Sequence, residues 1–138
     1  MIAIDTNVLL RYLLRDDADR AARADALFVA AETVLITDVV QVETVWTLAG
    51  RKYRLGKAEL VAVLERLFGE RNVRFEDDQA VWRPLQAYKS AGSSMGAGFV
   101  DCLIVFKALQ TASDAGAALT GVYTFDRSMQ RLPHAAPL

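Results

Sequence analysis

The sequence predicts an α/β fold, a three-layer sandwich in which helices cover both faces of a central parallel sheet. Two observations support this prediction. Short apolar, β-branched segments alternate along the chain with longer segments in which apolar residues recur at the helical period. The chain of 138 residues is also long enough to bury a core without disulfides or a structural metal. We therefore expect a single domain over residues 1–138, with no internal repeat and no linker.

Four segments are predicted to form the strands of the sheet. Each is a short run of apolar or β-branched residues that ends at a polar or turn-forming residue. Because helical segments separate the four runs, we expect the strands to be parallel. The strands are expected at residues 1–5, 33–37, 72–75 and 119–125.

The helices of the first half are predicted from their capping residues and their periodicity. Thr6 and Asn7 are good N-caps for a short helix at 8–15. An Ala-rich segment with acidic residues at its start follows it. Asp38 can cap the next helix, which ends at Gly50, and the segment after that has apolar residues at helical spacing. These three further helices are expected at 16–32, 39–50 and 56–70.

Two more helices are expected in the second half, at 76–91 and 99–116. Between them, the Gly- and Ser-rich residues 92–98 are expected to form a flexible loop. Pro84 must lie near the start of the first of these helices or kink it. After the last strand, Asp126 is followed only by a short tail.

Composition and charge limit the possible classes of protein. No apolar segment is long enough to cross a membrane, and the first residues lack the basic start of a signal peptide. The single Cys102 excludes an internal disulfide and suits a cytoplasmic location. The net charge of −1 argues against a strongly basic nucleic-acid binder, but basic residues cluster locally. The candidate phosphate contacts, for which a solvated surface is the alternative, are Arg11, Arg51, Lys52 and Arg54.

Two acidic residues directly follow predicted strands. Asp5 ends the first strand, and Asp126 comes directly after the last one. In parallel α/β folds, ligands bind beyond the carboxyl ends of the strands. Both residues are therefore candidates for a binding site, and the alternative for each is that it caps the helix or turn that follows.

Two further acids lie in apolar helical surroundings. In the helix of 39–50, Glu43 falls inside the apolar stripe that we expect to face the core. That stripe consists of Val39, Val42, Trp46 and Ala49. In the helix of 99–116, no rotation gives Asp101 a polar face, except toward the Gly-rich segment before it. Since carboxylates are rarely buried unless they are paired or bound to a metal, both acids are candidates for a metal site, with a buried ion pair as the alternative.

Together, Asp5, Glu43, Asp101 and Asp126 predict a site for a divalent cation at one end of the sheet. Four neighbouring carboxylates would repel one another and raise their pKa values unless a cation neutralised them. Oxygen ligands favour Mg²⁺ or Mn²⁺, and Zn²⁺ is disfavoured because its usual His and Cys ligands are missing. The only histidine, His134, lies in the tail, which argues against catalysis by a histidine pair or a Ser-His-Asp triad.

Four segments also carry a family resemblance, in order and at suitable spacing over nearly the whole chain. They are "IDTNVLLRYLLRDD", "VVQVETVWTL", "GAGFVDCLIV" and "VYTFDRSMQRL". They resemble the acidic elements of PIN-domain ribonucleases of the VapC type, the toxins of bacterial toxin–antitoxin pairs. The resemblance implies a PIN-like, Rossmann-like sandwich and an endoribonuclease that hydrolyses RNA through metal-activated water.

The resemblance also implies roles for individual residues. The catalytic and metal-binding acids would be Asp5, Glu43, Asp101 and Asp126, with Mg²⁺ or Mn²⁺ as cofactor. Asn7 would support Asp5, and Thr124 would orient a water or the neighbouring acid. Helix capping and strand propensity are the respective alternatives. Ser128 and Met129 depart from the pattern, because many relatives carry a second acid and an aromatic residue there. Asp126 therefore has no nearby substitute.

The resemblance further implies a cognate VapB-type antitoxin, an RNA substrate and a homodimer. Exposed apolar residues among 27–68, including Trp46 and Leu67, are candidates for contacts with these protein partners, with core packing as the alternative. The alternative function is a catalytically silent module of the same fold that binds RNA or regulates. A phosphatase or a phosphoacceptor domain is disfavoured, because Asn7 and Phe75 stand where those classes need aspartate.

Overall fold

The computed structural model describes residues 1–91 and 97–138. In it, the chain forms two compact units, Met1–Asp77 and Asp78–Leu138. Both units combine helices with parallel strands, which confirms the predicted α/β fold class. The expectation of a single domain stays a prediction. Most of the loop predicted at 92–98 lies outside the described residues.

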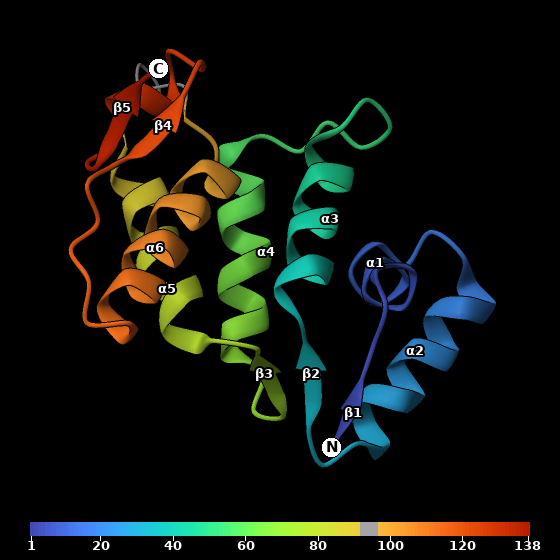
Figure 1. Ribbon diagram of the computed structural model, residues 1–138. Coiled ribbons are helices and arrows are strands. Elements are labelled where there is room, and N and C mark those ends of the chain that lie inside the picture. Colours follow the sequence, from blue (N-terminus) through green and yellow to red (C-terminus); the bar gives the residue numbers. More distant parts are fainter. Residues whose placement is uncertain (92–96) are drawn as a thin grey trace. The chain divides into compact units, whose positions relative to one another are not determined.

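The first unit contains a parallel sheet of three strands. Its elements, in chain order, are β1 (Ile2–Ala3), α1 (Thr6–Leu14), α2 (Ala18–Ala30), β2 (Val34–Ile36), α3 (Asp38–Ala49), α4 (Lys57–Gly69) and β3 (Val73–Phe75). The strands pair in the order β1–β2–β3, with Ile2 opposite Val34 and Val34 opposite Val73. Figure 1 shows the three strands side by side, with α3 continuing from the end of β2. The strands and helices predicted for this part of the chain are therefore confirmed.

Helix α3 differs from its prediction in two respects. Its N-cap is Thr37, whose hydroxyl accepts a hydrogen bond from the backbone N–H of Val40, and Asp38 is the first helical residue. Its orientation is also the reverse of the one predicted, because the stripe that contains Val39 and Trp46 does not face the core. Those two side chains are 68% and 64% exposed.

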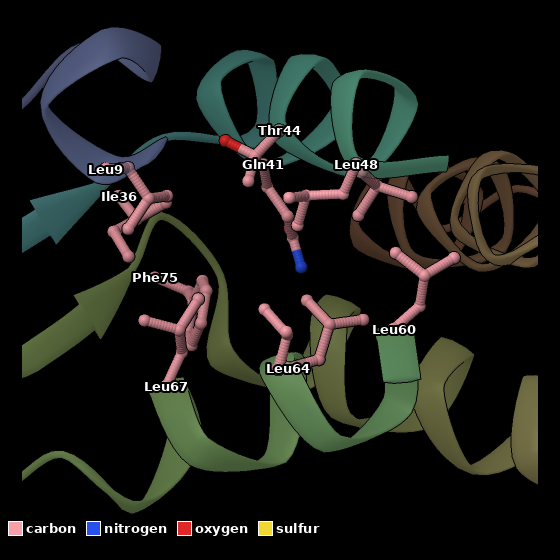
Figure 2. Close-up of a pocket in the computed structure, with 11 residues that line it drawn as sticks. Leu9, Ile36, Gln41, Thr44, Leu48, Leu60, Leu64, Leu67 and Phe75 are labelled. Atoms are coloured by element: carbon pink, nitrogen blue, oxygen red, sulfur yellow. The ribbon is translucent and has the colours of Figure 1, made fainter. Parts of the chain in front are cut away.

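The buried face of α3 carries two polar side chains. Gln41 is 2% exposed and Thr44 is 3% exposed. Neither the amide of Gln41 nor the hydroxyl of Thr44 has a hydrogen-bond partner among the described residues. Figure 2 shows Gln41 extending from α3 toward Leu64 of α4, in a narrow gap with apolar walls. Leu67, a predicted candidate for partner contacts, also lines this gap and is part of the core, with 2% of its surface exposed.

Asn72 connects the end of α2 to the sheet. Its side-chain Nδ2 donates to the carbonyl oxygens of Phe28 at 2.7 Å and Ala31 at 3.0 Å. Its own carbonyl oxygen accepts from the backbone N–H of Val34 at 2.7 Å. One residue therefore satisfies two carbonyl groups at the C-terminal end of α2 and one N–H group of β2.

Replacing Asn72 with Ala is expected to lower the free energy of unfolding by about 1–3 kcal/mol, because two carbonyl groups lose their donor. Urea denaturation followed by circular dichroism measures this loss. Asn72→Asp is expected to cost more, since a carboxylate would face two carbonyl oxygens. An unchanged midpoint in both variants would show that the two hydrogen bonds contribute nothing to stability.

The second unit contains two helices and a small parallel sheet. Its elements are α5 (Asp78–Ser90), α6 (Phe99–Asp114), β4 (Val122–Thr124), the short 3₁₀ helix η2 (Met129–Arg131) and β5 (Ala135–Pro137). Pro84 is buried in the interior of α5, away from its start. Among residues 1–91 and 97–138, no helix combines the length and apolar character needed to cross a lipid bilayer.

Strand β4 pairs with a strand that the sequence did not predict. In the predicted tail, β5 lies parallel to β4, with Val122 opposite Ala135 and Thr124 opposite Pro137. The backbone N–H of Val122 also donates to the carbonyl oxygen of His134 at 2.8 Å. Residues 119–125 thus contain the expected strand, and its hydrogen-bonded neighbour in the described structure is the C-terminal segment.

Candidate functional site

Asp5 is the N-cap of α1. Its backbone is extended, and its Oδ1 accepts a hydrogen bond from the backbone N–H of Val8 at 2.9 Å. The sequence prediction that Thr6 or Asn7 caps this helix is therefore wrong. Capping uses one carboxylate oxygen of this exposed side chain, and the described residues provide no partner for Oδ2. The capping role leaves one oxygen of Asp5 available to a ligand.

Glu43 lies beside the start of α1. The hydroxyl of Thr6, the first residue of α1, donates a short hydrogen bond to Oε2 of Glu43 on α3. Because Asp5 directly precedes Thr6, the structure brings two of the predicted acids to the same helix end. Glu43 was predicted as a site residue because it was expected to be buried within an apolar stripe. This reason is wrong, since Glu43 is exposed. The sequence did not predict the contact between Thr6 and Glu43. The only sequence signal for a role of Thr6 at the site is that it directly follows Asp5.

Asp101 and Asp126 belong to the second unit. Oδ2 of Asp101, in the first turn of α6, accepts from the backbone N–H of Gly98 at 2.8 Å. This agrees with the expectation that Asp101 points toward the Gly-rich segment. Oδ1 of Asp126 accepts from the backbone N–H of Ser128 at 2.7 Å, and the hydroxyl of Thr124 accepts from the N–H of Asp126 at 3.0 Å. Thr124 thus contacts the acid that it was predicted to orient.

The four acids share one arrangement. Each carboxylate has one oxygen held by a nearby donor, namely a backbone N–H or, for Glu43, a hydroxyl group. Two of the acids lie in each compact unit. Within residues 1–91 and 97–138, no three acidic, His or Cys side chains form a cluster that could hold a metal ion. The contacts therefore fix the direction of each carboxylate separately.

A depression lies next to Glu43, between α1 and α3. Its volume is about 430 Å³, and both acidic and basic side chains line it together with two aromatic rings. The residues that matter here are Thr6, Asn7, Arg11, Glu43, Trp46, Lys52 and Tyr53. We call it the aromatic depression. It combines groups that suit a metal, a phosphate and a flat ring.

A second depression lies between α1 and α2. Three arginines, Arg11, Arg20 and Arg23, line it together with Asn7 and apolar side chains. We call it the arginine depression. Since Asn7 and Arg11 line both depressions, the two are neighbours on the surface of the first unit. Asn7 was predicted to support Asp5, but it makes no hydrogen bond to Asp5 in the described structure. The structure instead places Asn7 where the two depressions meet.

Asp16 holds two residues of the aromatic depression in place. It forms an ion pair with Arg11, and its Oδ2 accepts from the hydroxyl of Tyr53 at 3.2 Å. The hydrogen bond from Arg11 lowers the pKa of the Asp16 carboxyl, with a smaller contribution from Tyr53. Asp16 consequently stays ionised, and Arg11 stays paired, at neutral pH. Of the other predicted phosphate contacts, Arg51 and Lys52 are exposed, and Arg54 donates through Nε to the carbonyl oxygen of Arg51.

Comparison with known protein families identifies the fold. The family model described as the PIN domain matches residues 2–135, which is nearly the whole chain. None of the curated proteins or solved structures shows significant similarity to this sequence. The match covers all four acidic segments and both compact units. The chain is a member of the PIN-domain family.

Proposed function

We propose that this protein is a metal-dependent endoribonuclease. The PIN domain is a nuclease fold, and its members generally depend on a divalent metal. The observation that carries the proposal is the hydrogen bond between Thr6 and Glu43, which places Glu43 beside the N-cap Asp5. Two carboxylates from distant parts of the chain are thereby held at one helix end, next to depressions lined by Arg11 and Lys52.

The donor set fits a hard cation. All four predicted ligands are carboxylates, each of which uses one oxygen in a local hydrogen bond. We propose that Asp5, Glu43, Asp101 and Asp126 hold Mg²⁺ or Mn²⁺. When bound, such an ion lowers the pKa of a water molecule and stabilises charge on a phosphate.

The protein's own residues would position the acids and the substrate. Thr6 would hold Glu43 in a fixed direction, and Thr124 would hold the backbone of Asp126. Arg11, Arg51, Lys52 and Arg54 would contact backbone phosphates, so RNA binding should weaken as salt rises. In-line hydrolysis of the phosphodiester would leave a 5′-phosphate and a 3′-hydroxyl. We further propose that the protein acts in the cytoplasm, on RNA of the same cell.

We also propose that the protein is the toxin of a toxin–antitoxin pair. The support is the ordered resemblance of the four acidic segments to VapC-type toxins. A VapB-type antitoxin and a second copy of the chain would be the protein partners. Leu27, Val29 and Val39, apolar side chains that are exposed on α2 and α3, remain candidates for those contacts. The alternative, a silent module of the same fold, predicts RNA binding without cleavage.

The test is an assay with end-labelled single-stranded RNA. We expect cleavage in Mg²⁺, its loss in excess chelator and its return when Mg²⁺ is restored. Asp101→Asn should remove cleavage, because asparagine carries no charge to bind the metal. Its side-chain oxygen can still accept from the N–H of Gly98, so the start of α6 should be preserved. Asp114→Asn, at the other end of α6, is the matched control and should stay active. Cleavage that persists in chelator would refute metal dependence, and binding without any cleavage would favour the silent module.

A further inference from the structure

We propose that Trp46 and Tyr53 form a stacking site for an unpaired base of the RNA, with Lys52 binding the adjacent phosphate. This inference rests on the proposed ribonuclease function and deepens it, because it assigns the features that select the substrate. All three residues line the aromatic depression beside Glu43. The site therefore lies next to two of the carboxylates assigned to the reaction.

Trp46 is exposed where a tryptophan would ordinarily be buried. It is 64% exposed, although it belongs to a helix whose other face packs in the core. Trp46 follows Glu43 by three residues, which places both side chains on the same face of α3. Single exposed apolar residues are common, but this one lines a depression that also contains charged groups. The indole thus offers a flat apolar surface within reach of a substrate held at Glu43.

Tyr53 and Lys52 supply a second ring and a positive charge. The hydroxyl of Tyr53 is fixed by Asp16 at 3.2 Å, so the ring is oriented before any ligand arrives. The Nζ of Lys52 lies 5.0 Å from the centre of that ring. Lys52 is exposed and forms no ion pair within the described structure. Its ammonium group, which lies over one face of the Tyr53 ring, can bind a phosphate beside a base that stacks on Trp46 or on the other face of that ring.

The charges favour a nucleic acid over an apolar protein segment. The arginine depression adjoins the aromatic one through Asn7 and Arg11. Each of its three arginines has an aspartate partner, and Arg11 is held by Asp16. The exposed pairs, Arg20 with Asp17 at 3.5 Å and Arg23 with Asp19 at 4.0 Å, are weak and can be exchanged for phosphate contacts. A strand lying across both depressions would meet rings on one side of Arg11 and further positive charge on the other. That alternation suits the bases and phosphates of a single strand.

The test measures Trp46 directly. The chain has two tryptophans, so Trp82→Phe leaves Trp46 as the only one. In that variant, combined with Asp5→Asn so that RNA stays intact, a short single-stranded RNA should quench the tryptophan fluorescence. A perfect duplex of the same sequence should quench it much less. Quenching that is equal for the duplex would overturn base stacking.

Affinity variants complete the test. By fluorescence anisotropy with labelled RNA, Trp46→Leu should weaken binding about 5- to 150-fold, the range measured for loss of one stacked base. Trp46→Phe should retain most of the affinity, because it keeps an aromatic ring. Trp82 is an exposed tryptophan on α5, and Trp82→Leu should leave the affinity unchanged.

Three outcomes distinguish failure of this inference from failure of the function on which it rests. Unaltered affinity in Trp46→Leu, with Mg²⁺-dependent cleavage intact, would overturn the stacking site and leave the ribonuclease standing. A change in oligomeric state of that variant without a change in RNA affinity would assign Trp46 to a protein interface and overturn the site as well. Absence of both RNA binding and cleavage in the unmodified chain would refute the ribonuclease itself, and the stacking site with it.

Discussion

Asp5→Asn is expected to reduce phosphodiester cleavage more than about 100-fold, because even residues that only support metal ligands contribute 10- to 100-fold. The same substitution should leave stability almost unchanged. Asparagine is as good an N-cap as aspartate, and its Oδ1 can still accept from the N–H of Val8. The variant therefore removes the charge and keeps the cap. Initial rates of RNA cleavage and thermal unfolding, measured on the same preparation, check both parts of the prediction.

Asp17 provides a matched control for this substitution. It is the N-cap of α2, and its Oδ1 accepts from the N–H of Arg20 at 3.0 Å, the same capping bond as at Asp5. Its Oδ2 also forms the weak, exposed ion pair with the Arg20 side chain. Asp17→Asn should therefore leave stability close to that of the unmodified chain and should not lower cleavage, because it keeps the cap and only releases Arg20. Asp5→Ala, in contrast, should lose cleavage and also about 1 kcal/mol of stability, since the cap is lost. If Asp5→Asn stays active, Asp5 is a helix cap alone.

The placement of the acids shows how far sequence reasoning reached. Asp5 and Asp126 were predicted from their positions directly after strands, and Asp101 from the apolar helix around it. The structure gives each a local donor that fixes its carboxylate. Glu43 was selected for burial that the structure does not show. Its contact with Thr6 joins residues 37 positions apart, which spacing along the chain does not encode.

The orientation of α3 could not be predicted from its periodicity. Val40, Val45 and Leu48 are buried on one face, while Val39 and Trp46 are exposed on another. A helix that is apolar around most of its circumference has no single stripe to identify the core side. The C-terminal strand β5 was missed for a different reason. It is three residues long and ends at Pro137, a residue that disfavours a strand assignment.

The buried face of α3 leads to the second large expected effect. Gln41→Met is expected to raise the free energy of unfolding by about 1–3 kcal/mol, which is the cost of burying a polar group without a partner. The amide of Gln41 lies among apolar side chains of α3 and α4 and has no partner among the described residues. Methionine is unbranched like glutamine and adapts to irregular gaps. Urea denaturation measures the gain.

Gln130 provides the opposite case on the same chain. Its Nε2 donates to the carbonyl oxygen of Thr124 at 2.9 Å, so Gln130→Met should lower stability, by about 1 kcal/mol. A gain at Gln41 with a loss at Gln130 would show that the missing partner, rather than the added hydrophobicity, decides the sign. A loss at Gln41 would contradict the prediction and would mean that its amide is satisfied in solution. Gln41 is buried and Glu43 is exposed on a different face of α3, so Gln41→Met should leave RNA cleavage unchanged. Unchanged cleavage in this variant would show that the stability of α3 and its role at the site depend on different faces of the helix.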